Sequence, residues 1–258
     1  MPFRDTNEIS QELSKIFREI QELPKVSCNR CGTVYRGEKE PFVCTNCIEK
    51  ENQEIEAKRK KAYQIQTLLN LSNIPKRYRR AIFRAKTDIQ HKVIEYFINN
   101  FMALGNDGFS LVSFGAKASD SQKVATDILL FGAIGTGKTY ISCAFAINAI
   151  EQKQIRVRYI TEYDLLELYF EKKYNEFKKF KECQILILDE IGKTVLADWQ
   201  RVQLEELLSH RYNEMLPTVY ITNLEQSDFR EFLGSRLADR LRENHLERFA
   251  FDGESLRG

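Results

Sequence analysis

The octapeptide GAIGTGKT at residues 132–139 constrains the fold more than any other feature of this sequence. It follows the apolar run DILLFG and opens the helix-prone segment GKTYISCAFAINAIEQ, so a buried strand passes through a glycine-rich turn into a helix. Such a turn curls its backbone N–H groups around a phosphate, and the helix N-terminus adds a favourable dipole. We expect Lys138 to reach the β- and γ-phosphates of a nucleotide and the Thr139 hydroxyl to bind Mg²⁺.

Strand and helix patterns alternate from about residue 86 onward. After the first strand come three further apolar runs that read as strands, IRVRYI, QILILDE and TVYITN. They are separated by the helical segments TEYDLLELYFEKKYNEFKKFK and ADWQRVQLEELLSHRYNEM. Helices of this length between strands predict an α/β fold, with a parallel sheet that helices cover on both sides.

Two acids follow four apolar residues in ILILDE, at the carboxyl end of a predicted central strand. This is the edge where α/β sheets bind ligands. We expect Asp189 to hold Mg²⁺ directly or through water, and Glu190 to orient and deprotonate an attacking water. At the end of VYITN, Asn223, with Thr222 as the alternative, is placed to reach between the acid and the γ-phosphate. An acid at position 190 favours ATP hydrolysis over simple nucleotide binding.

Four of the six cysteines form the pattern C-x₂-C-x₁₂-C-x₂-C, namely Cys28, Cys31, Cys44 and Cys47. Two such pairs of thiolates supply the tetrahedral sulfur coordination of a structural zinc ion. The competing explanations are two disulfides, which a reducing cytoplasm disfavours, and a chance spacing. Cys143 and Cys183 lie alone in apolar segments, where we expect buried and inert thiols.

The segments before the α/β region are helical and charged. Residues 6–23 have the apolar spacing of an amphipathic helix, whose partner is either its own chain or another protein. Residues 48–71 form a connecting helix, and Arg77, Arg79 and Arg80 then surround Tyr78, a cluster that could contact a phosphate backbone. The expected domains are an N-terminal helix plus zinc module at 1–50, a charged linker at 51–85, and an ATPase domain at 86–258.

The segment LGSRLADRLREN places Arg236 and Arg240 four residues apart, so both guanidiniums project from one face of a helix. One interpretation is a solvated face on which Asp239 and Glu243 are their ion-pair partners. The other is that the pair faces a negative charge on another molecule. Cleavage of a nucleoside triphosphate requires positive charge near the γ-phosphate, usually an arginine, which favours the second interpretation.

Composition excludes several classes of protein. The net charge of +2 creates no overall field that attracts nucleic acid, so any such binding depends on local patches. No apolar run reaches the roughly 18 residues of a membrane span, and the N-terminal residues do not form a secretory signal. A cytoplasmic protein without a membrane partner is expected.

From about residue 70 to residue 258, the chain resembles an AAA+ ATPase of the DnaC/DnaI-type helicase loader group, with the IstB transposition helpers as close relatives. The resemblance rests on NIPKRYRRAIF, LLFGAIGTGKTYIS, ILILDEIG, RYNEMLPTVYITNL and LGSRLADRL. It implies that Asp189 and Glu190 form the Walker B pair and that Asn223 is sensor 1. The implied Walker A nucleotide-binding loop consists of Gly132, Ala133, Ile134, Gly135, Thr136, Gly137, Lys138, Thr139 and Tyr140.

The resemblance also implies self-association. Arg240 matches the arginine finger, with Arg236 one turn before it, and in a head-to-tail ring or spiral both would serve the ATP of the neighbouring subunit. Arg257 matches the sensor 2 arginine by its place near the chain end, and would contact the ATP of its own subunit.

Members of the group bind single-stranded DNA through a helical insert, which corresponds to residues 163–181, including Tyr169, Lys172, Lys173 and Tyr174. In some loaders a zinc-binding N-terminal module grips the replicative helicase. We therefore expect an ATPase that loads a DnaB-type helicase onto single-stranded DNA. The alternatives are an ATPase helper of DNA transposition and a DNA-binding adaptor for which nucleotide is only a structural ligand.

Overall fold

The computed structural model describes residues 15, 18, 21–36, 43–102, 127–243 and 246–256. The chain divides into two compact units, Met1–Tyr63 and Gln64–Gly258. The predicted nucleotide-binding motif lies in the second unit.

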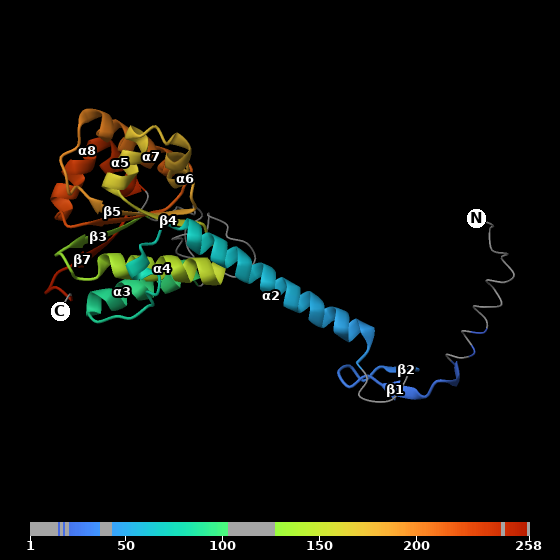
Figure 1. Ribbon diagram of the computed structural model, residues 1–258. Helices are drawn as coiled ribbons and strands as arrows, with labels where there is room; N and C mark the ends of the chain where they lie inside the picture. Colours follow the sequence, from blue (N-terminus) through green and yellow to red (C-terminus); the bar gives the residue numbers. More distant parts are fainter. Residues whose placement is uncertain are drawn as a thin grey trace, which may run out of the picture. The chain divides into compact units, whose positions relative to one another are not determined.

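A five-stranded sheet organises the second unit, with the strand order β4-β5-β6-β3-β7 and every pairing parallel (Figure 1). The strands are β3 (Ile128–Gly132), β4 (Val157–Thr161), β5 (Ile185–Ile191), β6 (Thr218–Thr222) and β7 (Glu247–Phe251). Strands β3 and β6 are buried along their whole length, as expected of central strands covered on both faces. The predicted parallel α/β fold is confirmed.

Helices cover both faces of this sheet, with α3 and α4 on one face and α5 to α8 on the other (Figure 1). Alternate residues of β5 therefore enter different cores: Ile187 packs with the α3–α4 side, and Leu186 with the α5–α8 side. The helical elements are η1 (Lys76–Tyr78), α3 (Asp88–Phe97), η2 (Ile98–Met102), α4 (Lys138–Lys153), α5 (Glu162–Phe170), α6 (Tyr174–Lys181), α7 (Asp198–Asn213) and α8 (Gln226–Glu243).

Three local features differ from the sequence expectation. Strand β7 was not predicted, because its five residues include two charged ones and the described strand that it pairs with, β3, is distant in sequence. The helical segment after β4 breaks into α5 and α6 at residues 171–173, where Lys172 has a φ of +57°. Helix α8 is kinked at Gly234, whose φ of +78° a side chain rarely adopts.

The first unit contains the hairpin of β1 (Lys25–Ser27) and β2 (Val34–Arg36), followed by most of α2 (Thr45–Leu71). The last turns of α2 lie in the second unit, where Ile65, Leu68 and Leu69 pack against its core. Most of the helix predicted at 6–23 lies outside the described residues. None of the helices that the structure describes combines the length and the apolar character of a membrane span.

Arg211 on α7 connects the starts of β5 and β6, at the end of the sheet opposite the nucleotide motif. Its side chain is fully buried, and its Nε donates to Thr218 Oγ1 at 2.9 Å. Its two terminal nitrogens donate to the carbonyl oxygens of Cys183 at 2.9 Å and of Pro217 at 2.7 Å. The guanidinium thus satisfies backbone acceptors that would otherwise be buried without a donor.

Arg211→Met is expected to lower the free energy of unfolding by about 3–5 kcal/mol, because it leaves these buried acceptors unsatisfied. Urea denaturation followed by circular dichroism measures this loss. Arg230→Met, on the exposed side of α8, is the matched control and should change stability by less than about 0.5 kcal/mol. Equal stability of the two variants would contradict the assignment.

Candidate nucleotide-binding site

The loop between β3 and α4 has the backbone that a phosphate site requires. Gly135 and Gly137 have φ angles of +84° and +94°, and Gly137 is the N-cap of α4. Gly132 also has a positive φ, and a Cβ there would lie 2.8 Å from the carbonyl oxygen of Phe251 on β7. A residue with a side chain is therefore disfavoured at Gly132, both by the positive φ and by the lack of space for a Cβ atom.

Lys138 is buried and its ammonium group lies inside the loop. Its Nζ donates to the carbonyl oxygens of Gly132 at 2.8 Å and Ala133 at 2.7 Å. The carbonyl oxygens of Gly132 and Ala133 thus hold the lysine ammonium group in place. The other predicted loop residues, Ile134 to Tyr140, line the neighbouring cavity.

This cavity has a volume of about 660 Å³, within the range of small-molecule sites. It brings together the loop between β3 and α4 (the P-loop), the acid pair and the end of β6. Besides the loop, its lining includes Arg77, Tyr78, Arg84, Lys86, Gln90, Asp189, Glu190, Lys193, Ile221, Thr222, Asn223 and Leu256. Arg236 and Arg240 are not in this lining, and Arg257 lies outside the described residues.

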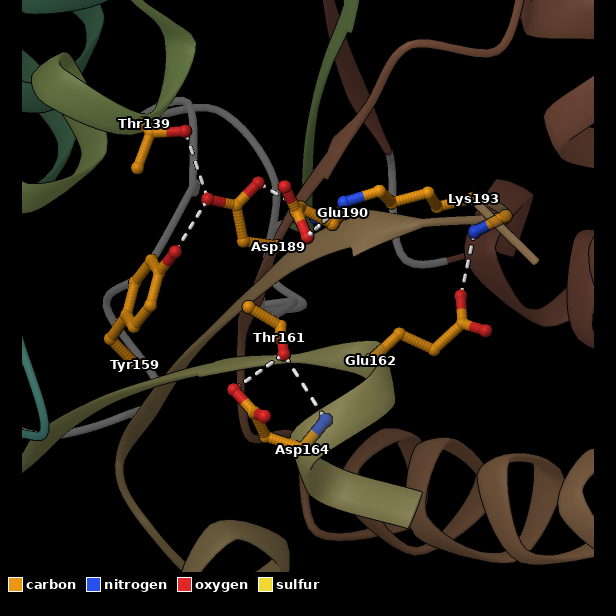
Figure 2. Close-up of polar contacts among 9 residues, drawn as sticks. Thr139, Tyr159, Thr161, Glu162, Asp164, Asp189, Glu190 and Lys193 are labelled. Carbon is orange, nitrogen blue, oxygen red and sulfur yellow. Dashed lines mark hydrogen bonds and ion pairs between the residues drawn. The ribbon is translucent and has the colours of Figure 1, made fainter. Parts of the chain in front are cut away.

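Asp189 accepts hydrogen bonds on both carboxylate oxygens (Figure 2). Thr139 Oγ1 and the Tyr159 hydroxyl donate to Oδ2 at 2.8 and 2.7 Å, and the N–H of Glu190 donates to Oδ1 at 2.7 Å. Burial raises the pKa of Asp189 above its ordinary value, and these three hydrogen bonds oppose the rise because they favour the carboxylate. Burial also raises the pKa of Tyr159, so its hydroxyl remains a donor.

Glu190 lies on strained backbone at the end of β5. Its φ is +56°, and the pairing with β6 shifts register between Leu188 and Ile191. The carboxylate forms an ion pair of 3.0 Å with Lys193 (Figure 2). About half of the Glu190 side chain is exposed, so water can reach it.

Buried Glu162, at the start of α5, supports the loop after this acid. Its Oε2 accepts from the N–H of Gly192 at 2.6 Å (Figure 2), and burial raises its pKa to about 7. Gln90 supports the P-loop as a donor: its Nε2 donates to the carbonyl oxygen of Thr136 at 2.8 Å. No sequence motif marks Tyr159, Glu162 or Gln90 as a site residue, because each acts through long-range contacts.

Part of the basic cluster before α3 lies at the nucleotide cavity, while Arg79 and Arg80 are exposed. Arg77 and Tyr78 line the nucleotide cavity, and the Arg77 guanidinium lies 5.8 Å from the centre of the Tyr78 ring. Tyr78 in turn meets Tyr140 edge to face at 6.5 Å. Arg79 Nε is directed to the carbonyl oxygen of Ile74.

The two arginines of α8 face α7. Arg236 forms an ion pair of 3.5 Å with Glu205, while Arg240 donates to Ser209 and lies 5.4 Å from the centre of the Tyr212 ring. Among the described ion pairs, neither uses Asp239 or Glu243, the partners expected of a solvated helix face. The kink at Gly234 begins a new helical segment that carries both arginines.

The predicted DNA-contacting residues lie around the break between α5 and α6. Tyr169 is partly buried against Tyr174 and Trp199, whereas Tyr174 is half exposed. Lys173 forms an ion pair of 2.7 Å with Glu171. Trp199 belongs to this aromatic cluster from α7, which the sequence segment alone did not indicate.

The four predicted cysteine ligands meet in the first unit. Their Sγ atoms all lie within 4.8 Å of one another, with Cys28–Cys47 and Cys31–Cys44 separations of 3.8 Å. A tetrahedral site with zinc–sulfur bonds of about 2.3 Å has sulfur–sulfur distances of about 3.8 Å. Backbone N–H groups, chiefly that of Cys44, lower the pKa of Cys28 to about 6 and so favour a thiolate. All six cysteines are free, which contradicts the disulfide alternative.

A parallel sheet with a P-loop after β3, an acid pair at the end of β5 and a polar side chain at the end of β6 defines an AAA+ nucleotide-binding protein. The family model described as IstB-like ATP binding protein matches residues 59–257. The chain belongs to this family, and the predicted resemblance is confirmed.

Two curated relatives differ in what their names describe. The insertion sequence IS5376 putative ATP-binding protein of Geobacillus stearothermophilus is 29% identical over 217 residues, which cover 79% of this chain and 77% of that protein. The replicative helicase loader DnaC of Escherichia coli K12 is 24% identical over 133 residues, which cover 49% of this chain and 54% of that protein.

Solved structures of helicase loaders have the same fold. The crystal structure of the DnaC helicase loader gives a TM-score of 0.55 at 23% identity, covering 68% of this chain and 99% of that chain. DnaI gives a TM-score of 0.58 at 17% identity, covering 74% and 99% respectively.

Proposed function

We propose that this chain is an ATPase that loads a DnaB-type hexameric helicase onto single-stranded DNA. One observation carries the proposal: the P-loop, the acid pair and Asn223 share one cavity, while a cysteine cluster of metal-binding geometry lies in a separate unit. The first unit would hold the helicase, and the aromatic and basic residues at the α5–α6 break would contact the DNA.

In this proposal Lys138 leaves the loop carbonyls for the β- and γ-phosphates, and Asn223 contacts the γ-phosphate. The Thr139 hydroxyl and the Asp189 carboxylate are hard oxygen donors that meet beside the P-loop, a set that fits Mg²⁺. When bound, Mg²⁺ would neutralise negative charge on the phosphates. Glu190 exchanges its ion pair with Lys193 for the attacking water, from which it accepts a proton.

The cysteine cluster is expected to hold one zinc ion per chain. Cys44→Ser is expected to reduce the zinc content of the purified protein at least about tenfold, because the site loses one of four thiolates. Elemental analysis of protein purified without added metal measures this. Cys143→Ala removes a buried cysteine outside the cluster and should retain the full zinc content. A zinc-free wild-type chain would contradict the assignment.

The loading proposal is tested with purified components: the full chain, the hexameric replicative helicase of the same cell, and circular single-stranded DNA. With ATP present, light scattering is expected to show a complex of the chain with the helicase. The helicase is also expected to remain bound to the closed DNA circle. Cys44→Ser should lose the complex, whereas Lys138→Ala should lose retention on DNA. Absence of a complex with the helicase at micromolar concentrations would contradict the loading function while leaving the ATPase assignment intact.

A second candidate function is that of an ATPase helper of DNA transposition. The observation that favours it is the insertion-sequence relative, whose similarity extends over 79% of this chain. ATP-dependent binding to the transposase of an insertion sequence, without binding to the helicase, would support this function over loading.

A further inference from the structure

Tyr159 reaches the acid pair from β4, a strand that carries none of the predicted nucleotide motifs. Its side chain is 8% exposed, and its ring packs in the core on the α3–α4 side of the sheet. The hydroxyl donates to Asp189 Oδ2 at 2.7 Å, beside the 2.8 Å bond from Thr139 to the same oxygen (Figure 2). Tyr159 is not in the lining of the cavity, so it acts on the site through Asp189.

Three donors fix the Asp189 carboxylate, and two of them belong to the nucleotide machinery itself. Thr139 is a candidate metal ligand, and the N–H of Glu190 belongs to the strained end of β5, which also carries the candidate base. Only the Tyr159 hydroxyl comes from a different strand with a packed side chain. It is therefore the donor that can keep the carboxylate oriented while the other two groups engage nucleotide and water.

The backbone of Tyr159 is anchored at the opposite side of β4. Strand β4 is at the edge of the sheet, so among the described strands none lies beside its outward N–H groups. The N–H of Tyr159 instead donates to the carbonyl oxygen of Ser72 at 2.7 Å. Ser72 is fully buried directly after α2, and its hydroxyl donates back to the carbonyl oxygen of Leu69 in that helix at 2.7 Å.

We propose that Tyr159 is a positioning residue for Asp189, and that its anchor at Ser72 couples the end of α2 to the magnesium–nucleotide site. This inference rests on the proposed ATP-dependent function. The hydroxyl of Tyr159 then contacts the metal-binding carboxylate. Its N–H contacts the end of the helix that leads from the cysteine unit. Nucleotide occupancy would alter the contact at Ser72, and a partner acting on α2 would alter the orientation of Asp189.

Tyr159→Phe removes only the hydroxyl, and binding of a fluorescent ATP analogue is measured against Mg²⁺ concentration. The Mg²⁺ concentration for half-maximal binding is expected to rise about tenfold, as for other supporting contacts of metal ligands. Tyr220→Phe, which removes a buried hydroxyl from β6 in the other core, is the matched control and should give the wild-type curve. Superposition of the Tyr159→Phe and wild-type curves would overturn the positioning role. Failure of the wild type itself to bind the analogue would instead overturn the ATP function.

A double-mutant cycle separates positioning from a general loss of structure. In an Asp189→Asn background, Tyr159→Phe is expected to cause no more than about a twofold further shift, because the two residues act together. A full additional tenfold shift would show that Tyr159 acts independently of Asp189, and would contradict the proposal.

Hydrogen exchange tests the coupling to α2. In the wild type, Mg²⁺ with a non-hydrolysable ATP analogue is expected to change the exchange rate of the Tyr159 amide, which bonds to Ser72, at least about threefold. In Tyr159→Phe at saturating Mg²⁺ and nucleotide, this change should disappear. An unchanged rate in the wild type, or the same change in both proteins, would overturn the coupling.

Discussion

Glu190→Gln is expected to lower the rate of ATP turnover about 10²- to 10³-fold while leaving nucleotide affinity within about twofold of wild type. Glutamine retains the size and the hydrogen-bonding capacity of the side chain but cannot accept a proton from water. Glu190 lies at the cavity with about half of its side chain exposed, so the substitution removes a base and one exposed ion pair, which contributes little to stability. Steady-state phosphate release and equilibrium binding of labelled ATP measure the two effects.

A matched control is Glu206→Gln, which removes an exposed acid that pairs with Lys181 at 2.8 Å, outside the cavity. It should retain wild-type turnover. If Glu190→Gln also retained turnover, Glu190 would not be the base. If the wild type bound ATP but released no phosphate, the adaptor hypothesis, in which nucleotide is only a structural ligand, would replace the ATPase proposal.

The parts of the site that sequence predicted are those that local patterns determine. The glycine spacing of the P-loop dictates its backbone, and acids after an apolar run must emerge at the end of a strand, so Lys138, Thr139 and Asp189 were predictable. The spacing of the cysteines likewise predicted the cluster in the first unit, because each pair forms one tight turn.

The parts that sequence did not predict depend on contacts between distant segments. Gln90 reaches the P-loop across 46 residues, and Tyr159 reaches Asp189 across 30, with no motif at either end. Strand β7 is similar, since its short, partly charged sequence becomes a strand only beside β3. A basic cluster such as that around Tyr78 shows its charge in the sequence but not the surface that the charge faces.

A head-to-tail assembly predicts that two inactive variants restore ATP turnover when they are mixed. Arg240→Ala is expected to reduce turnover about a thousandfold, because the pocket loses the positive charge that stabilises the cleaved phosphate. Lys138→Ala is expected to abolish turnover for a different reason, the loss of phosphate binding in its own loop. Arg240 faces α7 and is absent from the lining of the cavity of its own chain. In the head-to-tail assembly, the two substitutions would therefore affect the sites of different subunits.

Mixing Arg240→Ala with Lys138→Ala is therefore expected to restore turnover. A pocket of the first variant beside an arginine of the second is complete, and random assembly of equal amounts makes about a quarter of the sites complete. Recovery should peak near equal amounts of the two proteins, and light scattering with nucleotide and DNA should show assemblies larger than a monomer. Arg242→Ala, which removes an exposed arginine that pairs with Asp239 on the same helix, should keep wild-type turnover without mixing. No recovery at any ratio, together with full wild-type turnover by a monomer, would mean that each subunit completes its own site. Arg240 would then stabilise the packing of α8 on α7 through its contacts with Ser209 and Tyr212.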